Sequence, residues 1–178
     1  MQLITQEDFD NFKVIDGIKQ CQSGDYSQIK VFGEWCSFGE RCSFGKWCSF
    51  GERCSFGEWC SFGERCSFGE GCSFGECCSF GEWCSFGECC SFGEGCSFGE
   101  SCKVIGLTLN QQVVYYISSI GNSNRTLYMW NTEDGIYFQA GCRIEKEDTF
   151  IIAVKESYGE NSQYEKAMNM LKQLHLGE

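Results

Sequence analysis

The sequence has a single histidine, no proline and no long run of apolar residues. A helix that crosses a bilayer needs about 20 consecutive apolar residues, and no segment approaches this length. The first eight residues turn polar at once, which predicts that no signal peptide is present. We therefore expect a cytoplasmic protein whose sixteen cysteines are mostly reduced thiols.

Positive charge is also scarce, since the formal net charge is −11. Residues 32–102 hold eleven glutamates against Arg41, Lys46, Arg53 and Arg65, a balance of −7. Such a surface repels nucleic acid and anionic membranes, so we expect direct binding to neither. Imitation of DNA by an acidic array is a rarer use of the same charge and stays open as an alternative.

The sequence does contain a six-residue motif, Phe-Gly-Glu-x-Cys-Ser, in which x varies. This motif is repeated twelve times between residues 32 and 102. Lysine replaces glutamate once, at Lys46, and Lys103 ends the series. A period this strict predicts a solenoid, in which each repeat buries its apolar residues by stacking on its neighbours. We divide the chain into an N-terminal cap (1–25), the repeat array (26–104) and a C-terminal unit (105–178).

The spacing within the repeat predicts which side chains face inward. Cys and Phe lie two residues apart, so in a strand both point to the same side, and the variable residue and Ser point to the other. The Gly after Phe suits a corner with an unusual backbone angle, and the charged Glu belongs on that corner in water. Tyr26 lies six residues before Phe32, in the same phase, so the first coil is expected to begin there.

Twelve regularly spaced cysteines could suggest a metal site, but their spacing argues against one. Zinc needs four ligands that converge tetrahedrally, whereas a solenoid sets its cysteines in columns along the axis. Buried cysteine behaves as a small apolar residue, so we interpret these thiols as core packing and expect no metal and no cofactor. Cys77 and Cys89 occupy the outward variable position and are either exposed, reactive thiols or neutral replacements.

The hexad, for example Phe38 to Ser43, resembles the hexapeptide repeat of left-handed β-helices. In that family three hexads form one triangular coil, which gives about eighteen residues per coil. The resemblance implies a mostly β protein, a left-handed parallel β-helix that carries a small C-terminal α+β unit. Phe and Cys replace the aliphatic and small inward residues of the family. The wording Cys-Ser-Phe-Gly-Glu also resembles repeat proteins of bacteria and their phages.

The flanking segments predict a cap and a small mixed unit. Residues 5–8 form a capping-box-like helix start that Phe9 and Phe12 follow at helical spacing. After the array, the apolar pattern predicts strands over 113–117, 126–130 and 136–140, with turns at 121–124 and 133–135. Helices are predicted over 148–158, ended by Gly159, and from about residue 161 onward.

Catalysis is not expected. The enzymes that left-handed β-helices form use histidine as a base or metal ligand, and the only histidine, His175, is predicted to be solvated in a terminal helix. Every repeat glutamate has the same surroundings, whereas acid–base catalysis needs two carboxylates in different ones. No nucleophile elbow and no glycine-rich phosphate loop is present.

The variable position carries the clearest functional signal, because large Trp and Arg alternate there in the early repeats. On an eighteen-residue coil this alternation predicts the following vertical pairs: Arg53 over Trp35, Trp59 over Arg41, and Arg65 between Trp47 and Trp83. Trp and Arg are enriched at interface hot spots, and their pairing also stabilises a surface by itself. The predicted binding residues are Trp35, Arg41, Trp47, Arg53, Trp59, Arg65 and Trp83.

These observations predict a binding protein, with a phage or prophage association implied by the resemblance. It would sequester a small ligand such as a nucleotide signal, or block a host protein. An acidic DNA mimic and a purely structural scaffold are the alternatives. Exposed tryptophans predict a homo-oligomer, a trimer or a dimer. The resemblance implies the same, because proteins of the hexapeptide family are typically trimers.

Overall fold

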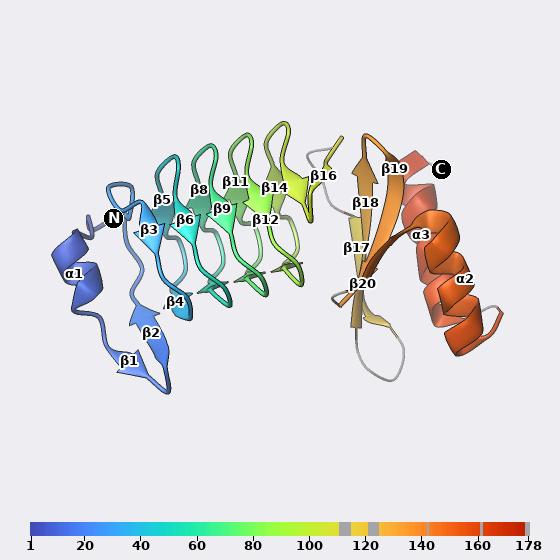
Figure 1. Ribbon diagram of the computed structural model, residues 1–178, viewed down its shortest axis with the longest axis horizontal. Helices are drawn as coiled ribbons and strands as arrows, with labels where there is room; N and C mark the ends of the chain where they lie inside the picture. The colour runs from blue at the N-terminus through green and yellow to red at the C-terminus, as the bar shows by residue number, and fades with distance from the viewer. Residues whose placement is uncertain (111–114, 121–124, 142, 161, 177–178) are drawn as a thin grey trace. The chain divides into compact units, whose positions relative to one another are not determined.

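The computed structural model describes residues 1–110, 115–120, 125–141, 143–160 and 162–176 (Figure 1). The chain divides into two compact units, Met1–Thr108 and Leu109–Glu178. The first is a parallel β-solenoid of about 5 turns, and the second is an antiparallel sheet with helices. The predicted fold class, mostly β with a small C-terminal α+β unit, is confirmed.

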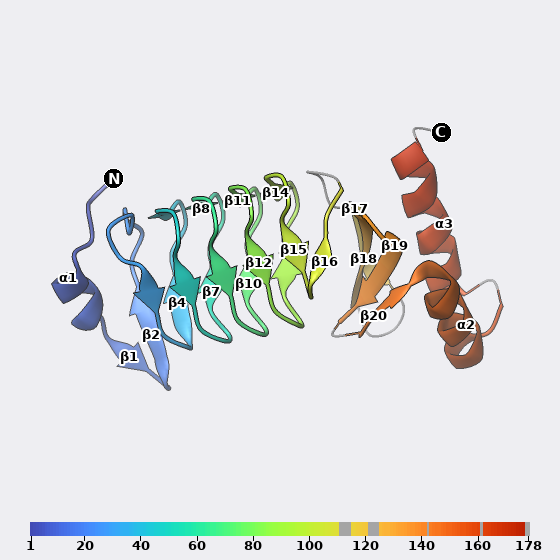
Figure 2. The same cartoon turned by 45° about the horizontal axis from the view of Figure 1, so that its top comes forward.

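Short strands build the solenoid, and Figure 2 shows its successive coils stacked along one axis. One sheet contains, in order, β1 (Val14–Ile15), β2 (Ile18–Cys21), β4 (Cys36–Phe38), β7 (Ser55–Phe56), β10 (Ser73–Phe74) and β13 (Ser91–Phe92). The second contains β14 (Ser97–Phe98), β11 (Ser79–Phe80), β8 (Ser61–Phe62) and β5 (Ser43–Phe44). The third contains β16 (Leu107–Thr108), β15 (Lys103–Val104), β12 (Ser85–Phe86), β9 (Ser67–Phe68), β6 (Ser49–Phe50) and β3 (Val31–Phe32).

The register of these strands fixes the length of a coil. Ser55 pairs with Ser73, and Ser73 pairs with Ser91, always in parallel. Partners are therefore three hexads apart, as predicted. Within the repeats, identical side chains lie above one another, so the sequence repeat becomes a set of columns.

Columns of phenylalanine rings fill the interior. Phe44 and Phe62 stack with ring centroids 4.9 Å apart and planes 3° from parallel. Within a coil the rings meet edge to face, as Phe56 and Phe62 do at 5.0 Å and 88°. Both arrangements are favoured by the aromatic quadrupole, so each ring is satisfied on its faces and on its edges. The repeat Phe and Cys side chains are all buried, which confirms the predicted interior.

The cysteines pack as small apolar groups at the edge of this core. The thiol of Cys66 donates to the carbonyl oxygen of Gly45 in the preceding coil, at 3.3 Å. Hydrogen bonds with the thiols of Cys42 and Cys78, together with burial, raise the pKa of the Cys60 thiol, which keeps it neutral. Two cysteines occupy variable positions. Cys77 has a half-buried free thiol, whereas the sulfur of Cys89 is not a free thiol.

The prediction that the Gly after Phe adopts an unusual backbone angle is wrong. The positive φ lies two residues later, at the variable position, where Gly71 has φ +68°. The Gly after Phe is required for space: a Cβ on Gly69 would lie 2.8 Å from the backbone nitrogen of Glu52 in the coil below. The chain passes so close at this corner that only a hydrogen fits.

The ends of the solenoid are closed by an extra helix and by two hairpins. The helix α1 (Gln6–Asp10) has the predicted capping box: the Asp8 N–H donates to the Thr5 hydroxyl at 3.2 Å, and the Thr5 N–H donates to the Asp8 carboxylate at 2.9 Å. The Thr5 hydroxyl also donates to this carboxylate at 2.7 Å and holds the pKa of Asp8 below its usual value. The Phe9 ring covers Phe32, edge to face at 5.2 Å. β1 and β2 form an antiparallel hairpin at this end, and β15 and β16 form one at the other. Since exposed edges invite aggregation, such hairpins cap them.

Parallel stacking begins before Tyr26, because β2 already pairs with β4 in the register Cys21 to Phe38. Tyr26 itself is fully buried and stacks on Phe44 at 5.2 Å. The segment that precedes the repeats thus contributes a rung of its own as well as a cap.

The C-terminal unit is a four-stranded antiparallel sheet with two helices. Its elements are β17 (Tyr115–Ile120), β18 (Arg125–Thr132), β19 (Gly135–Ala140), β20 (Arg143–Lys146), α2 (Glu147–Tyr158) and α3 (Gln163–Leu176). Both helices pack against the sheet, and the buried core between them includes Leu127, Phe138, Phe150 and Leu171. None of the helices in the described residues is long and apolar enough to cross a membrane.

Most predictions for this unit are confirmed, and two are wrong. The strand β20 was not predicted, because its charged, four-residue sequence has no apolar alternation. His175 is half-buried instead of solvated: its ring packs on Tyr115 at 5.7 Å, and its Nε2 lies 3.4 Å from Asn131. Gly159 ends α2 with φ +79° as predicted. The predicted turn at 121–124 and the start of the strand at 113–114 lie outside the described residues.

Candidate binding surface

The Trp and Arg side chains of the variable position project from the corners of the coils. The prediction placed them on the outer faces, but no strand of the repeats contains the variable residue, which lies in the turn with Glu. Trp47 has φ +64° and Arg65 has φ +60°, which is the left-handed region. This conformation directs each side chain outward from the triangular coil.

The left-handed angle is costly for these residues, at roughly 1–2 kcal/mol each relative to a right-handed conformation. Glycine adopts it freely, and Gly71 and Gly95 occupy the same slot with φ +68° and +70°. The backbone bond is also the same: the nitrogen of Arg53 donates to Glu70 at 2.8 Å, and that of Gly71 donates to Glu88 at 2.8 Å. The corner therefore closes without a side chain, so the coil does not require Trp or Arg there.

Three vertical columns result from the eighteen-residue spacing. The first column contains Trp35, Arg53, Gly71 and Cys89. The second contains Arg41, Trp59, Cys77 and Gly95. The third contains Trp47, Arg65, Trp83 and Ser101. Large side chains gather in the early coils of all three columns, and the third column carries them furthest.

Two of the predicted Trp–Arg contacts form. The guanidinium carbon of Arg53 lies 4.9 Å from the ring centroid of Trp35, and that of Arg65 lies 4.6 Å from that of Trp47. Exposed cation–π contacts contribute about 0.5–1 kcal/mol each. Within the described residues, the predicted contacts of Trp59 with Arg41 and of Trp83 with Arg65 do not form.

The tryptophans are unusually exposed for their size. The relative exposures are 61% for Trp47, 56% for Trp59, 54% for Trp83 and 40% for Trp35. Trp is the largest apolar side chain, and burying one completely is favourable by a few kcal/mol. Three rigid corners thus hold large aromatic groups in water, which is typical of an interaction surface.

Glutamates accompany these side chains along every corner. The repeat glutamates are exposed and recur every eighteen residues, so columns of carboxylates run beside the Trp and Arg columns. The single lysine in this position, Lys46, forms an ion pair with Glu64 in the next coil at 2.7 Å. Strands in a stack lie about 4.8 Å apart, which leaves the other carboxylates to be screened by water and salt. The surface offers aromatic groups within a negative field.

Comparison with protein families gives one match. The model of an RNA-binding, Nab2-type zinc finger matches residues 31–45, 35–57, 47–63, 59–75 and 90–103. These overlapping segments cover about a third of the chain and repeat the same Cys spacing. Comparison with curated proteins and with solved structures finds no significant match.

The geometry of the matched segments does not fit a zinc finger. They contain no histidine, since the only one is His175. Their repeat cysteines are buried in columns, and from Cys54 onward the thiols are directed at glycine carbonyls of the preceding coil, as Cys54 is at Gly33 at 3.3 Å. Across the described part of the chain, no three His, Cys, Asp or Glu side chains are grouped so that they could hold a metal ion. The matched segments share with one another the regular recurrence of cysteine.

Proposed function

We propose that this chain is a non-enzymatic binding protein that attaches to the surface of another protein through the Trp and Arg corners of its early coils. One observation carries the proposal: glycine closes the same corner at Gly71 and Gly95, yet six earlier corners hold Trp or Arg at a conformational cost. Residues retained against the stability of the coil are typical of functional surfaces. Trp and Arg are also the residues that dominate interface energies.

The charge around these corners favours a protein partner. Free anions and nucleic acid are repelled by the glutamate columns, whereas a partner with basic residues around an apolar pocket is attracted. A projecting corner also covers a flat small molecule on one side only, while a protein partner can enclose the whole tryptophan. The resemblance to phage repeat proteins supports a bacterial host protein as the target. The six-residue period and the coil of three hexads support kinship with hexapeptide-repeat left-handed β-helices.

Exchange of the exposed tryptophans for glycine tests the proposal. The triple variant Trp47→Gly, Trp59→Gly, Trp83→Gly should remain folded, with a free energy of unfolding within about 2 kcal/mol of the parent, because glycine suits the left-handed corner. Its affinity for a partner captured from bacterial lysate should fall at least about 100-fold, as expected for the loss of several interface hot spots. Circular dichroism and surface plasmon resonance supply the two measurements.

The matched control is Ile152→Ala, which removes an exposed apolar side chain from α2 in the C-terminal unit. It should leave partner binding unchanged. Full affinity in the triple variant would show that the corners only cover the solenoid and would overturn the proposal. If nucleotides raise the melting temperature of the chain in a thermal-shift screen and no protein partner is captured, its function would instead be to sequester a small ligand.

The glutamate columns favour a second candidate, an acidic mimic of DNA that blocks a nucleic-acid-binding protein. In that case the carboxylates would carry the affinity, which would fall steeply with salt, and the tryptophan variant would lose little. Binding measured at low and at high salt for the parent and the triple variant separates the two candidates.

Self-association is part of the proposal, because exposed tryptophans also favour contact between copies. We expect a trimer or a dimer in light scattering at micromolar concentration. The same triple tryptophan variant should be monomeric if the copies meet through their corners. A monomeric parent protein would contradict this expectation without affecting the binding of another protein.

A further inference from the structure

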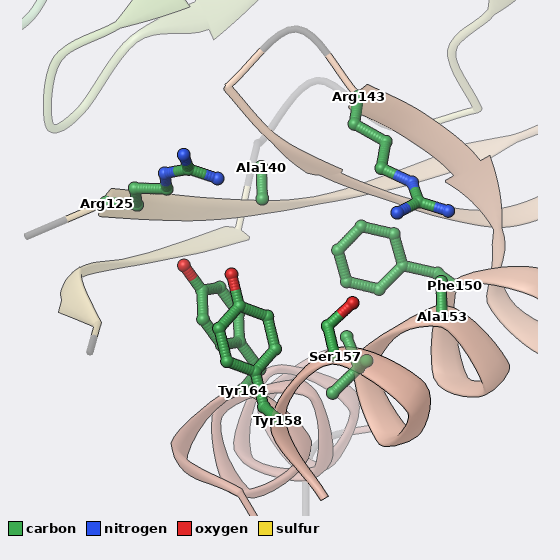
Figure 3. Close-up of a pocket in the computed structure, with 9 residues that line it drawn as sticks. Arg125, Ala140, Arg143, Phe150, Ala153, Ser157, Tyr158 and Tyr164 are labelled. Carbon is green, nitrogen blue, oxygen red and sulfur yellow. The ribbon is translucent and has the colours of Figure 1, made fainter. Parts of the chain in front are cut away.

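The C-terminal unit contains a pocket that the repeat array does not explain. It is lined by Arg125 and Ala140 from the sheet, Arg143 from β20, Ser157 and Tyr158 from α2, and Tyr164 from α3, among others (Figure 3). Its volume is about 90 Å³. A cavity needs about 10–15 Å³ of such volume to hold one water molecule, so the pocket has room for several waters or one small polyatomic anion.

A buried hydroxyl group inside this pocket has no hydrogen-bond partner among the residues that the structure describes. Tyr164 is 4% exposed, and its buried Oη forms no hydrogen bond within that part of the chain. Leaving such a group unpaired costs about 1–3 kcal/mol, and native proteins rarely accept that cost without a reason. The stacked ring of Tyr158, 4.8 Å away, fixes the Tyr164 ring and therefore the direction of its hydroxyl.

Positively charged and hydroxyl side chains line the same pocket as Tyr164. Figure 3 shows the guanidinium groups of Arg125 and Arg143 on opposite sides of the pocket, with the hydroxyls of Tyr158 and Tyr164 directed from the helices toward the strand of Arg125. Arg143 also donates to Glu145 through Nε and Nη2, at 3.0 and 2.9 Å. Arginine has five N–H donors, so this ion pair orients Arg143 and leaves donors for a ligand.

We propose that this pocket binds the phosphate group of a small phosphorylated ligand. The donors come from three directions, two strands and the helix pair, which suits a tetrahedral group better than a planar carboxylate. The volume fits one phosphate group, and the exposed rim of Arg125, Ser157 and Tyr158 lets the rest of the ligand extend into solvent. Glu145 offsets the charge of Arg143, so Arg125 leaves the pocket with a local excess of positive charge in an otherwise acidic chain.

The test is isothermal titration calorimetry on the full chain, with inorganic phosphate, O-phosphoserine and acetate as probes. We expect saturable binding of phosphate, and tighter binding of phosphoserine if the natural ligand is an ester. Acetate should bind more weakly than either. Tyr164→Phe should weaken phosphate binding about 10-fold, the equivalent of one hydrogen bond to a charged group, and Arg125→Gln should weaken it at least as much.

Folding does not confound the comparison. Tyr164→Phe keeps the packed ring and removes an unpaired hydroxyl, so its melting temperature without ligand should not fall. Tyr137 lies in β19, a strand of the sheet that contributes to the pocket, but its side chain does not line the pocket. The control variant Tyr137→Phe should therefore bind phosphate as the parent does. The proposal is overturned if phosphate does not bind saturably, if Tyr164→Phe binds it like the parent, or if acetate binds as tightly. A pocket filled only by water would give these results.

Discussion

Replacement of Phe62 by alanine is expected to lower the free energy of unfolding by about 3–5 kcal/mol. The ring is buried between the stacked rings of Phe44 and Phe80, each 4.9 Å away, and it meets neighbours in its own coil edge to face. A side chain from the adjacent coils cannot fill the space, because every neighbour is already held in its own column. The effect is measured by urea denaturation followed by circular dichroism.

The matched control is Ser61→Ala, the exposed residue directly before the ring. It should change stability by less than about 0.5 kcal/mol, as is usual for surface positions. Phe62→Leu should lie between the two, since leucine retains most of the buried apolar volume. A loss below about 1 kcal/mol for Phe62→Ala would contradict a close-packed aromatic interior.

Replacement of Gly69 by alanine is expected to destabilise the solenoid by about 3 kcal/mol or more, at the upper end of overpacking effects. The new Cβ would lie 2.8 Å from Glu52 N and 2.8 Å from Gly51 C, which are backbone atoms that have no free rotation. Relief would require the two coils to separate, and this would stretch the 3.0 Å hydrogen bond from Gly69 N to Phe50 O.

The first repeat provides an internal control for this prediction. Gly33 stands in the same Phe-Gly-Glu phrase and in the same corner column, but it has no coil beneath it, and a Cβ added there would meet nothing within 4 Å. Gly33→Ala should therefore leave the melting temperature almost unchanged, while Gly69→Ala lowers it by many degrees. Equal effects of the two substitutions would show that glycine acts through backbone freedom instead of through contact between coils.

These predictions separate the two roles that one repeat combines. Phe, Cys and the following Gly determine whether the coils stack, and changes there should affect stability. The variable residue tolerates Trp, Arg, Gly, Cys or Ser with the same corner conformation, and changes there should affect binding. A protein built in this way can vary its surface without rebuilding its core, because in a solenoid each residue contacts only its own and adjacent coils.

The sequence by itself determined the solenoid. A strict six-residue period with Phe and Cys two residues apart leaves one face to bury, so the buried set follows from spacing alone. The coil of three hexads, and with it the vertical pairing of Arg53 with Trp35, follows from the resemblance to hexapeptide repeats. Local signals of the same kind located the capping box at Thr5 and the end of α2 at Gly159. These features depend on residues that are neighbours in the chain or that repeat at a fixed distance.

Only the tertiary structure decided the rest, because it depends on contacts between residues with no regular spacing. The role of the Gly after Phe changed from a backbone angle to a contact distance, which requires the next coil to be in place. Gly71 and Gly95 in the variable slot were the available sequence signal that the positive φ lies there. The donors that line the pocket around Tyr164 come from two strands and two helices, so no local sequence motif predicts the pocket. Charge, burial and direction meet there only after the sheet and helices have packed.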